Sequence, residues 1–457
     1  MIEELITIIA SRACALSYTH TTLLAHGKPV SHREVTKSII RDILIEIYVY
    51  DVSMMYFLRN RVAHPDWQVK FMKAPCSLTR RQFLKTSTAL GAAVMSARPA
   101  RAVWPLQFQS YPKVGIERCR RYDYELVRAT LAKLFDGIGD IPALVKGKTV
   151  TIKVNLTSYM AEGVYTLSSV ETVHTHPVVV LAACSLFQEY GAHRMIICES
   201  FPSNDETLQA FNNHKYDVAL FQSQIQNLEW ENTRNLGSGS RYSTLSVGEG
   251  AYLFNSFDLN YRYAETDVMV SIAKMKNHDI AGITLSMKNL FGITPNSLYA
   301  DPGNERATKV RTLLHDGTTR PAADGEIQPV TSHDPGFRVP RIVTDICRAR
   351  PIDLAIIDAI VTMTGGEGAW NGLQTGIAVP NLLIAGTNCV STDAVTASVM
   401  GYDPHAADRT KPFYNCSNIL RLAADRNLGT NDLDQIEVIG LSIEDARYFI
   451  QPGLDRG

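Results

Sequence analysis

The chain has 457 residues, which is more than a single small module needs and enough to bury a large core. Its 45 Lys and Arg nearly balance its 46 Asp and Glu, and 45% of its residues are hydrophobic, which excludes a disordered chain, a nucleic-acid-coating protein and a polytopic membrane protein. Eight scattered cysteines without a Cys-x-x-Cys pair predict neither a disulfide scaffold nor an iron–sulfur cluster.

Residues 72–102 contain no acidic residue. Arg80 and Arg81 precede a short, mildly apolar stretch, and Ala100 and Ala102 follow it. The segment resembles a twin-arginine (Tat) signal peptide, with a basic start, an apolar part too short to span a bilayer and a small-x-small cleavage site. This resemblance implies the Tat export machinery as a partner, cleavage after Ala102 and a periplasmic or other extracytoplasmic location.

Residues 1–71 precede this signal, although a signal peptide normally begins near the N-terminus. We therefore expect translation to start at Met72 and residues 1–71 to be an upstream extension with a mis-called start. The alternative is a genuine cytosolic segment. In the mature chain we expect no stable membrane span.

Residues 103–146 are predicted to be a linker and an N-terminal helix at 122–135, where apolar residues recur at helical spacing. Residues 147–440 then alternate short apolar runs with helical patterns. The predicted strands are 149–154, 194–198, 267–273, 353–359, 381–385 and 435–439. The predicted helices are 177–190, 282–290, 392–400 and 415–426. This alternation predicts one large α/β domain with an open, mostly parallel sheet covered by helices on both faces.

Two segments depart from this alternation. Residues 299–340 are rich in Gly, Pro, Asp and Thr, which predicts a long loop excursion over the surface of the domain. Residues 441–457 are predicted to be a C-terminal tail.

Polar side chains follow most of the predicted strands. They are Lys153 and Asn155, then Glu199, then Lys274, Lys276 and His278, then Asp358, and finally Asp393. Because the carboxyl ends of parallel strands meet at one edge of a sheet, a ligand site is expected there.

A glycine-rich loop, 365–368, follows the strand at 353–359, and its backbone amides are expected to approach a ligand closely. The sequence lacks Gly-x-Gly-x-x-Gly and Gly-Lys-Ser/Thr. No nucleotide cofactor is therefore expected.

Two strings occur in a specific order: Lys-x-Lys-x-His at 274–278 and Met-Lys-Asn-Leu-Phe-Gly at 287–292. Together with His176-Pro177 and Asp358-Ala359, they resemble domain-of-unknown-function family 362 over about residues 147–440. The resemblance implies no established catalytic residues. Some members carry a cysteine-rich ferredoxin module, but this sequence has no such cluster, so an iron–sulfur role is not implied.

Four lysines at one sheet edge would form a site for a small anionic ligand, because ammonium groups favour phosphate or carboxylate. The predicted ligand-binding residues are Lys153, Asn155, Lys274, Lys276, Lys288 and Asn289. The alternative is that each lysine pairs with a nearby acid such as Glu199 or Asp358, and that the asparagines serve as caps or turn residues.

The same edge contains enough imidazole and carboxylate for a divalent metal, although the cofactor remains unassigned. The candidate ligands are His174, His176, His278 and Asp358. The alternative is structural: His176 caps the helix that begins at Pro177, and Asp393 stabilises the first turn of the helix at 392–400.

We therefore expect an exported enzyme that acts on a phosphate- or carboxylate-bearing ligand in a pocket lined by lysine and histidine. His278 is the predicted general acid or base, and the lysines would stabilise negative charge that develops in the transition state. Glu199 or Asp393 would orient the lysines or titrate against them. The alternative is a non-catalytic periplasmic ligand-binding or redox-accessory protein that uses the same pocket.

Overall fold

The computed structural model describes residues 111–157, 163–201, 205–235, 239–300, 311–315, 323–327 and 332–453. The predictions for residues 1–102 lie outside these ranges. The described part belongs to one compact unit, Gln107–Gly457.

The fold is built on one eight-stranded sheet. Across the sheet the strands are β14 (Glu437–Gly440), β1 (Lys113–Arg118), β13 (Leu382–Gly386), β10 (Leu354–Ala359), β7 (Val268–Lys274), β2 (Thr149–Val154), β3 (Arg194–Glu199) and β4 (Leu228–Asn232). All neighbouring pairs are parallel except the two made by β13, which runs antiparallel to β1 and to β10. The predicted mostly parallel α/β sheet is confirmed.

The central strands are rich in apolar residues because both faces of the sheet are buried. In β3, Ile196 belongs to one hydrophobic core and Ile197 to the other, and Ile357 and Ile356 of β10 divide in the same way. Successive side chains of a strand point to opposite faces of the sheet. A strand between two helical layers therefore needs apolar residues at both its odd and its even positions.

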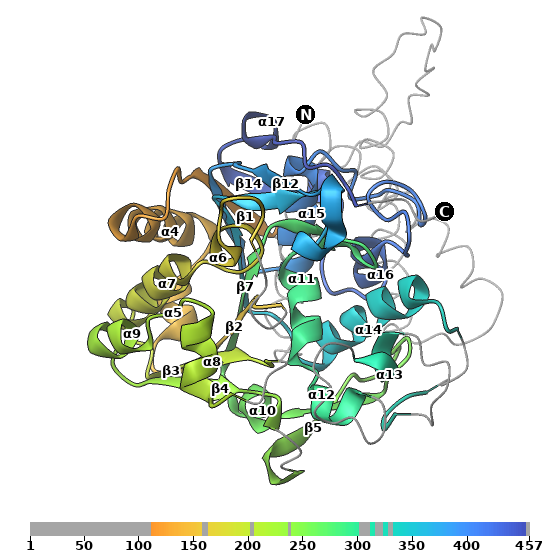
Figure 1. The fold of residues 1–457 in the computed structure, drawn as a ribbon, viewed down its shortest axis with the longest axis horizontal. Helices are drawn as coiled ribbons and strands as arrows, with labels where there is room; N and C mark the ends of the chain where they lie inside the picture. Colours follow the sequence, from red (N-terminus) through yellow and green to blue (C-terminus); the bar gives the residue numbers. More distant parts are fainter. Residues whose placement is uncertain are drawn as a thin grey trace, which may run out of the picture. The chain divides into compact units, whose positions relative to one another are not determined.

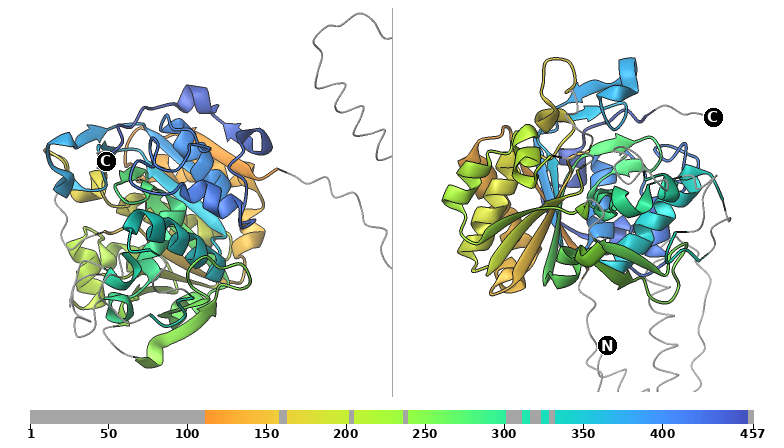
Figure 2. Two further views of the ribbon diagram at one scale, coloured as in Figure 1. Left: turned by 90° about the vertical axis from the view of Figure 1, so that its right-hand side faces the viewer. Right: turned by 60° about the horizontal axis from the view of Figure 1, so that its bottom comes forward.

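Each core is closed by its own layer of helices (Figures 1 and 2). One layer contains α4 (Tyr124–Ile138), α5 (Ile141–Val145), α7 (Pro177–Glu189), α8 (Thr207–Asn213) and α9 (Val218–Gln224). The other contains α11 (Ser286–Asn289), α14 (Pro335–Ala349), α15 (Cys389–Val399) and α16 (Ile419–Ala424). Figure 2 shows the sheet between these two layers, as predicted.

Shorter elements decorate this core. The remaining helices are α6 (Ser169–Thr172), α10 (Tyr261–Glu265), α12 (Asn296–Tyr299), α13 (Thr312–His315) and α17 (Ile443–Ala446). Three two-stranded ribbons pair β5 (Tyr242–Ser246) with β6 (Ser256–Asn260), β8 (Lys276–His278) with β9 (Gly282–Thr284), and β11 (Thr362–Thr364) with β12 (Gly376–Ala378).

Two strands of the large sheet were not predicted. β1 lies in the segment expected to be a linker and one helix, and its Gly115 packs so closely under α4 that a Cβ there would lie 2.7 Å from a methyl carbon of Leu134. β4 carries two charged residues, Glu229 and Glu231, which interrupt the apolar pattern of a buried strand. In the structure both carboxylates pair with arginines. Residues 113–146 are therefore part of the main fold.

The predicted helix 282–290 is wrong in its first half, because Gly282–Thr284 is strand β9, paired with β8. Only Ser286–Asn289 is α-helical. Gly282 has a φ of 73°, which glycine tolerates and which does not fit a helix. The turn places β8 and α11 close together beside the sheet.

The predicted loop at 299–340 also differs from the structure. Its described part contains α13, and its last residues already belong to α14. The helical pattern of α14 was obscured by Pro340 in its interior and by the buried Arg338, whose guanidinium pairs with Glu326 at 2.8 Å.

Candidate functional site

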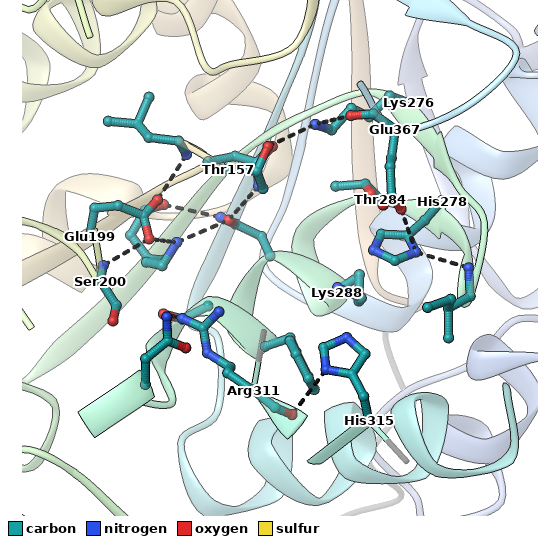
Figure 3. Close-up of a pocket in the computed structure, with 18 of the residues that line it drawn as sticks. Thr157, Glu199, Ser200, Lys276, His278, Thr284, Lys288, Arg311, His315 and Glu367 are labelled. Atoms are coloured by element: carbon teal, nitrogen blue, oxygen red, sulfur yellow. Dashed lines mark hydrogen bonds and ion pairs between the residues drawn. The ribbon is translucent and has the colours of Figure 1, made fainter. Parts of the chain in front are cut away.

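A cavity of about 470 Å³ lies beyond the carboxyl ends of β2 and β3, where β8, α11 and α13 meet (Figure 3). Its charged and imidazole lining residues are Lys153, Glu199, Lys276, His278, Lys288, Arg311, His315 and Glu367. Four cations therefore face two carboxylates. The size suits a small molecule, and the lining favours a negatively charged one.

Lys153 and Glu199 form a buried ion pair at the inner wall of this cavity, with 2.8 Å between Nζ and Oε1. Burial lowers the pKa of Lys153, and Glu199 offsets part of that effect. The Glu199 carboxylate also accepts hydrogen bonds from the backbone amides of Leu156 at 2.8 Å and Ser200 at 2.9 Å. Glu199 is thus fully engaged in holding the ends of β2 and β3.

Gly292 explains why the chain can pack so closely over the Lys153–Glu199 ion pair. A Cβ at Gly292 would lie 3.0 Å from Lys153 Nζ and 3.5 Å from Glu199 Oε1. The chain after α11 therefore passes directly over the ion pair.

The two predicted amide residues connect β2 to α11. Asn155 Nδ2 donates to Asn289 Oδ1 at 3.1 Å, and Asn289 Nδ2 donates to the Lys153 carbonyl at 3.2 Å and to Ser271 Oγ at 3.0 Å. Both asparagines line the cavity. Their side-chain amides nevertheless make hydrogen bonds mainly to each other and to β2 and β7, and so fix the wall of the cavity.

Lys276 enters the cavity from β8 and contacts backbone oxygens. Its Nζ donates to the carbonyls of Val173 at 2.9 Å and Glu367 at 2.8 Å, and it lies 3.3 Å from Thr157 Oγ1. Burial, together with the nearby Lys274 and Lys288, lowers its pKa to about 7, although Glu367 opposes the shift.

This shift predicts a specific dependence of stability on pH. Between pH 7 and the usual lysine pKa of 10.5, the unfolded chain binds one more proton at Lys276 than the folded chain does. The contribution of Lys276 to the free energy of unfolding therefore rises with pH in this window, by about 1.4 kcal/mol per pH unit. Lys276→Met should remove that slope in urea titrations at pH 7, 8 and 9, whereas Lys133→Met on the surface should keep it. Parallel pH profiles for wild type and Lys276→Met would contradict the assignment.

His278 forms a pair with Glu367, with 2.8 Å between Nδ1 and Oε2. Burial lowers the pKa of His278, while Glu367 acts in the opposite direction. Burial alone would raise the pKa of Glu367, but His278, Lys288 and Lys276 together hold it well below its usual value. The carboxylate is thus ionised and orients the imidazole, in the manner of an acid–base pair.

Glu367 was not predicted as a site residue, although the loop that carries it was singled out. The amides of Glu367 and Gly368 donate to Asn371 Oδ1 at 3.0 and 3.2 Å, so these amides stabilise the loop itself. The loop contributes the Glu367 carboxylate and the half-exposed Trp370 to the cavity. A carboxylate between glycines just after a strand was the available sequence signal.

Lys288 projects into the cavity from α11 (Figure 3). Its Nζ lies 4.5 Å from the centroid of the Phe291 ring. Burial lowers its pKa to about 8; Glu367 opposes this shift, while Arg311 and Lys153 add to it. Among the described residues Lys288 makes no hydrogen bond or ion pair.

Arg311 and His315 complete the cavity from α13 and the residue before it, within the segment predicted to be a loop. Arg311 donates to the carbonyls of Thr294 at 2.5 Å and Gly292 at 3.2 Å, and burial lowers its pKa to about 10. Burial lowers the pKa of His315 to about 4, so this imidazole is neutral at pH 7. No pattern in the sequence pointed to either residue.

Lys274 and Asp358, in contrast, lie outside the cavity lining and neutralise each other. Their side chains are fully buried, with 2.7 Å between Nζ and Oδ2. Lys274 also donates to Tyr122 Oη at 2.9 Å, and Asp358 accepts from the Tyr122 hydroxyl and the His176 amide. Lys274 therefore forms an ion pair with a nearby acid, which was the alternative to ligand binding for the lysines.

Asp393 also lies outside the cavity lining. Its carboxylate accepts from the amides of Ser286 and Met287, both at 2.9 Å, and from Ser286 Oγ at 2.6 Å. Burial raises its pKa to about 7, against these hydrogen bonds. Because α15 begins at Cys389, Asp393 lies beyond the first turn of its own helix and instead holds the start of α11.

The four candidate metal ligands do not form one cluster, and His176 and Asp358 are joined only by a hydrogen bond from the His176 backbone amide. His176 caps α7 by accepting from the Val178 amide and stacks on Tyr122 at 3.7 Å between ring centroids. The buried His174 lies 2.7 Å from the Thr157 carbonyl oxygen. Within the described ranges, no three His, Cys, Asp or Glu side chains are grouped as metal ligands.

The comparison with known families matches two parts of the chain. Residues 150–398 match the family described as "Domain of unknown function (DUF362)", and residues 77–97 match the twin-arginine translocation signal sequence. The predicted signal and export across the membrane are thereby confirmed. In the part of the chain that the structure describes, the helices are too short or too polar to cross a bilayer.

Individual relatives are more distant. A thylakoid-associated protein of Synechocystis sp. is 24% identical over 319 residues, which cover 70% of this chain and 80% of that protein. Two solved structures align with a TM-score of 0.32. A Thermotoga maritima protein is 12% identical, and the alignment covers 54% of this chain and 52% of that protein's chain. The lactate racemase apoprotein of Thermoanaerobacterium thermosaccharolyticum is 13% identical, and the corresponding shares are 60% and 56%.

Proposed function

The chain belongs to the DUF362 family, whose description names no activity, and we propose from the cavity that this exported member is an enzyme acting on a small carboxylate- or phosphate-bearing ligand. In this proposal Lys276, Lys288 and Arg311 bind the negative charge. His278, oriented by Glu367, donates a proton to the bound ligand or accepts one from it.

The distribution of charge in the cavity carries this proposal. Glu199 neutralises Lys153, and Glu367 pairs with His278. Lys276, Lys288 and Arg311 form no ion pair with a carboxylate of the described residues, so they leave an excess of positive charge in a partly enclosed space. A low-dielectric wall strengthens the attraction of such charges for an anion.

The acid–base groups support catalysis over simple capture. The Nδ1 atom of His278 contacts the Glu367 carboxylate and the Ile280 amide, whereas the other ring nitrogen, Nε2, has no hydrogen bond to a described residue and can meet the ligand. Lys276, with a pKa of about 7, exchanges protons near neutral pH as well. Efficient general acids and bases have pKa values close to the working pH.

Calorimetric titration of the mature chain tests the anion site. Pyruvate, 2-oxoglutarate, citrate and inorganic phosphate would be titrated at low salt, with acetone and glycerol as uncharged controls. We expect at least one of these anions to bind with one-to-one stoichiometry, and we expect neither uncharged control to bind. Lys288→Met removes the least engaged cation and should weaken that binding by about 1.5–3 kcal/mol, the scale of a hydrogen bond to a charged group.

Two matched variants separate the possible outcomes. Lys133→Met, at a surface lysine that is 69% exposed, should leave the affinity unchanged. His278→Gln should retain binding but lose proton exchange on the ligand, measured by NMR in deuterated water. Equal affinity in wild type and Lys288→Met would refute the anion site, and unchanged exchange in His278→Gln would refute the role of the imidazole.

A further inference from the structure

Lys288 differs from the other cations of the cavity because its amine makes no hydrogen bond or ion pair with a residue that the structure describes. Lys153 is paired with Glu199, Lys276 contacts two carbonyls, and Arg311 donates to two carbonyls. The Nζ atom of Lys288 lies over the Phe291 ring, and its electrostatic neighbours are Glu367, Arg311 and Lys153. Its side chain is therefore available to a ligand.

The backbone beneath Lys288 is fixed on both sides. Asp393 holds the amides of Ser286 and Met287 at the start of α11, and Asn289 is tied to β2 and β7 through the Lys153 carbonyl and Ser271. These contacts account for a buried carboxylate that lies outside the cavity. They fix the point from which the lysine side chain projects.

The surroundings of Lys288 favour a reactive amine. With a pKa of about 8, about a tenth of the side chain is unprotonated at pH 7, far more than for an exposed lysine. Desolvation and nearby cations are the usual ways in which proteins activate a lysine as a nucleophile. Figure 3 places Lys288 between Arg311 and His278, so an anion-binding group and an acid–base group flank it.

We propose that Lys288 is a nucleophile that forms a Schiff base with the carbonyl group of a 2-oxo acid bound in the cavity. This inference rests on the proposed anion-binding function and names its substrate class. Arg311 would bind the carboxylate of the oxo acid. His278 would serve the proton transfers at the carbonyl oxygen.

The step balances without an oxidant or reductant. His278 takes up the proton that the Lys288 ammonium group loses, the lone pair of the resulting amine attacks the carbonyl carbon, and a C–N bond forms. One proton then moves from this nitrogen to the carbonyl oxygen to give a neutral carbinolamine. The C–O bond then breaks, and the hydroxyl group leaves as water with a proton from His278. The product is a protonated imine between Lys288 and the former carbonyl carbon, with one water released.

Lys276 is a weaker candidate for the same role. Its Nζ already lies within hydrogen-bond distance of two carbonyls and Thr157 Oγ1. Attack on a ligand would break at least one of these contacts. Lys288 has no such contact to lose among the described residues.

Reductive trapping tests the inference. The mature chain is incubated with pyruvate or 2-oxoglutarate and sodium cyanoborohydride, and intact mass and peptide mapping follow the products. We expect one reduced adduct per chain, located on Lys288, and much less adduct with acetone, which has no carboxylate. Lys288→Arg keeps the cation and should lose the adduct, whereas Lys133→Arg should form it as wild type does.

The outcomes distinguish the covalent step from the binding site. If calorimetry shows that an oxo acid binds but no adduct forms, or if Lys288→Arg is trapped like wild type, the Schiff base is overturned and the anion site stands. If no anion binds, the proposed function fails as well. Thermal melts of Lys288→Arg and Lys133→Arg establish that both variants are folded.

Discussion

Lys274→Met should lower the free energy of unfolding of the mature chain by about 3–5 kcal/mol, the cost of leaving one partner of a buried ion pair alone. Lys274 and Asp358 are both fully buried and are 2.7 Å apart. Methionine keeps most of the apolar stem but cannot neutralise the carboxylate. Hydrogen bonds from Tyr122 and His176 would remain, and they do not supply a positive charge.

Urea titration of the mature chain measures this loss. Lys133→Met is the matched control, because Lys133 pairs with Glu117 at the surface and should cost less than about 1 kcal/mol. The double variant Lys274→Met with Asp358→Asn should recover part of the loss, since it removes the unpaired charge. A loss for Lys274→Met no larger than that of the control would show that the pair is not structural.

Replacing Arg80 and Arg81 together by lysine should abolish export and leave the precursor in the cytoplasm. The signal match covers both residues. Lysine keeps the charge but lacks the planar, five-donor guanidinium group, so a receptor that recognises the arginine pair should reject it. Cell fractionation with immunoblotting measures the effect, and Arg98→Lys, outside the matched segment, is the control. Undiminished export of the double variant would contradict the signal assignment.

The sequence predicted the sheet well where both faces of a strand are buried. β2 was predicted with its full length, because every residue of Thr149–Val154 except Lys153 is β-branched, and β3, β7 and β10 were predicted from their mostly apolar runs. β1 and β4 were missed because their polar and glycine residues serve contacts made by distant segments. Strand propensity alone does not record such partners.

The sequence also located the correct edge of the sheet for the cavity. Lys153, Lys276, His278 and Lys288 were predicted from their positions after strands or in a family-like string, and all four line the cavity. The sequence could not distinguish Lys276, which faces the cavity, from Lys274, which lies beside Asp358. Two residues apart in a chain that continues from β7 into β8, they meet different surroundings only after folding.

Arg311 and His315 show a different limit. They lie in a segment whose Gly, Pro and Thr content predicted a surface loop, yet α13 brings them to the cavity wall. Asp393 shows the reverse case, since its place near a strand end suggested catalysis and its hydrogen bonds all go to the start of α11. Local composition carries no information about which distant backbone a side chain will meet.

A crystal structure of the mature chain, grown with the anion that binds most tightly in calorimetry, would show whether the cavity is the anion site. We expect the anion to occupy the cavity, with its charged group within hydrogen-bond distance of Arg311 or Lys276 and its reacting carbon beside Lys288 Nζ. An anion bound only at the outer surface, with the cavity filled by water, would refute the proposed site.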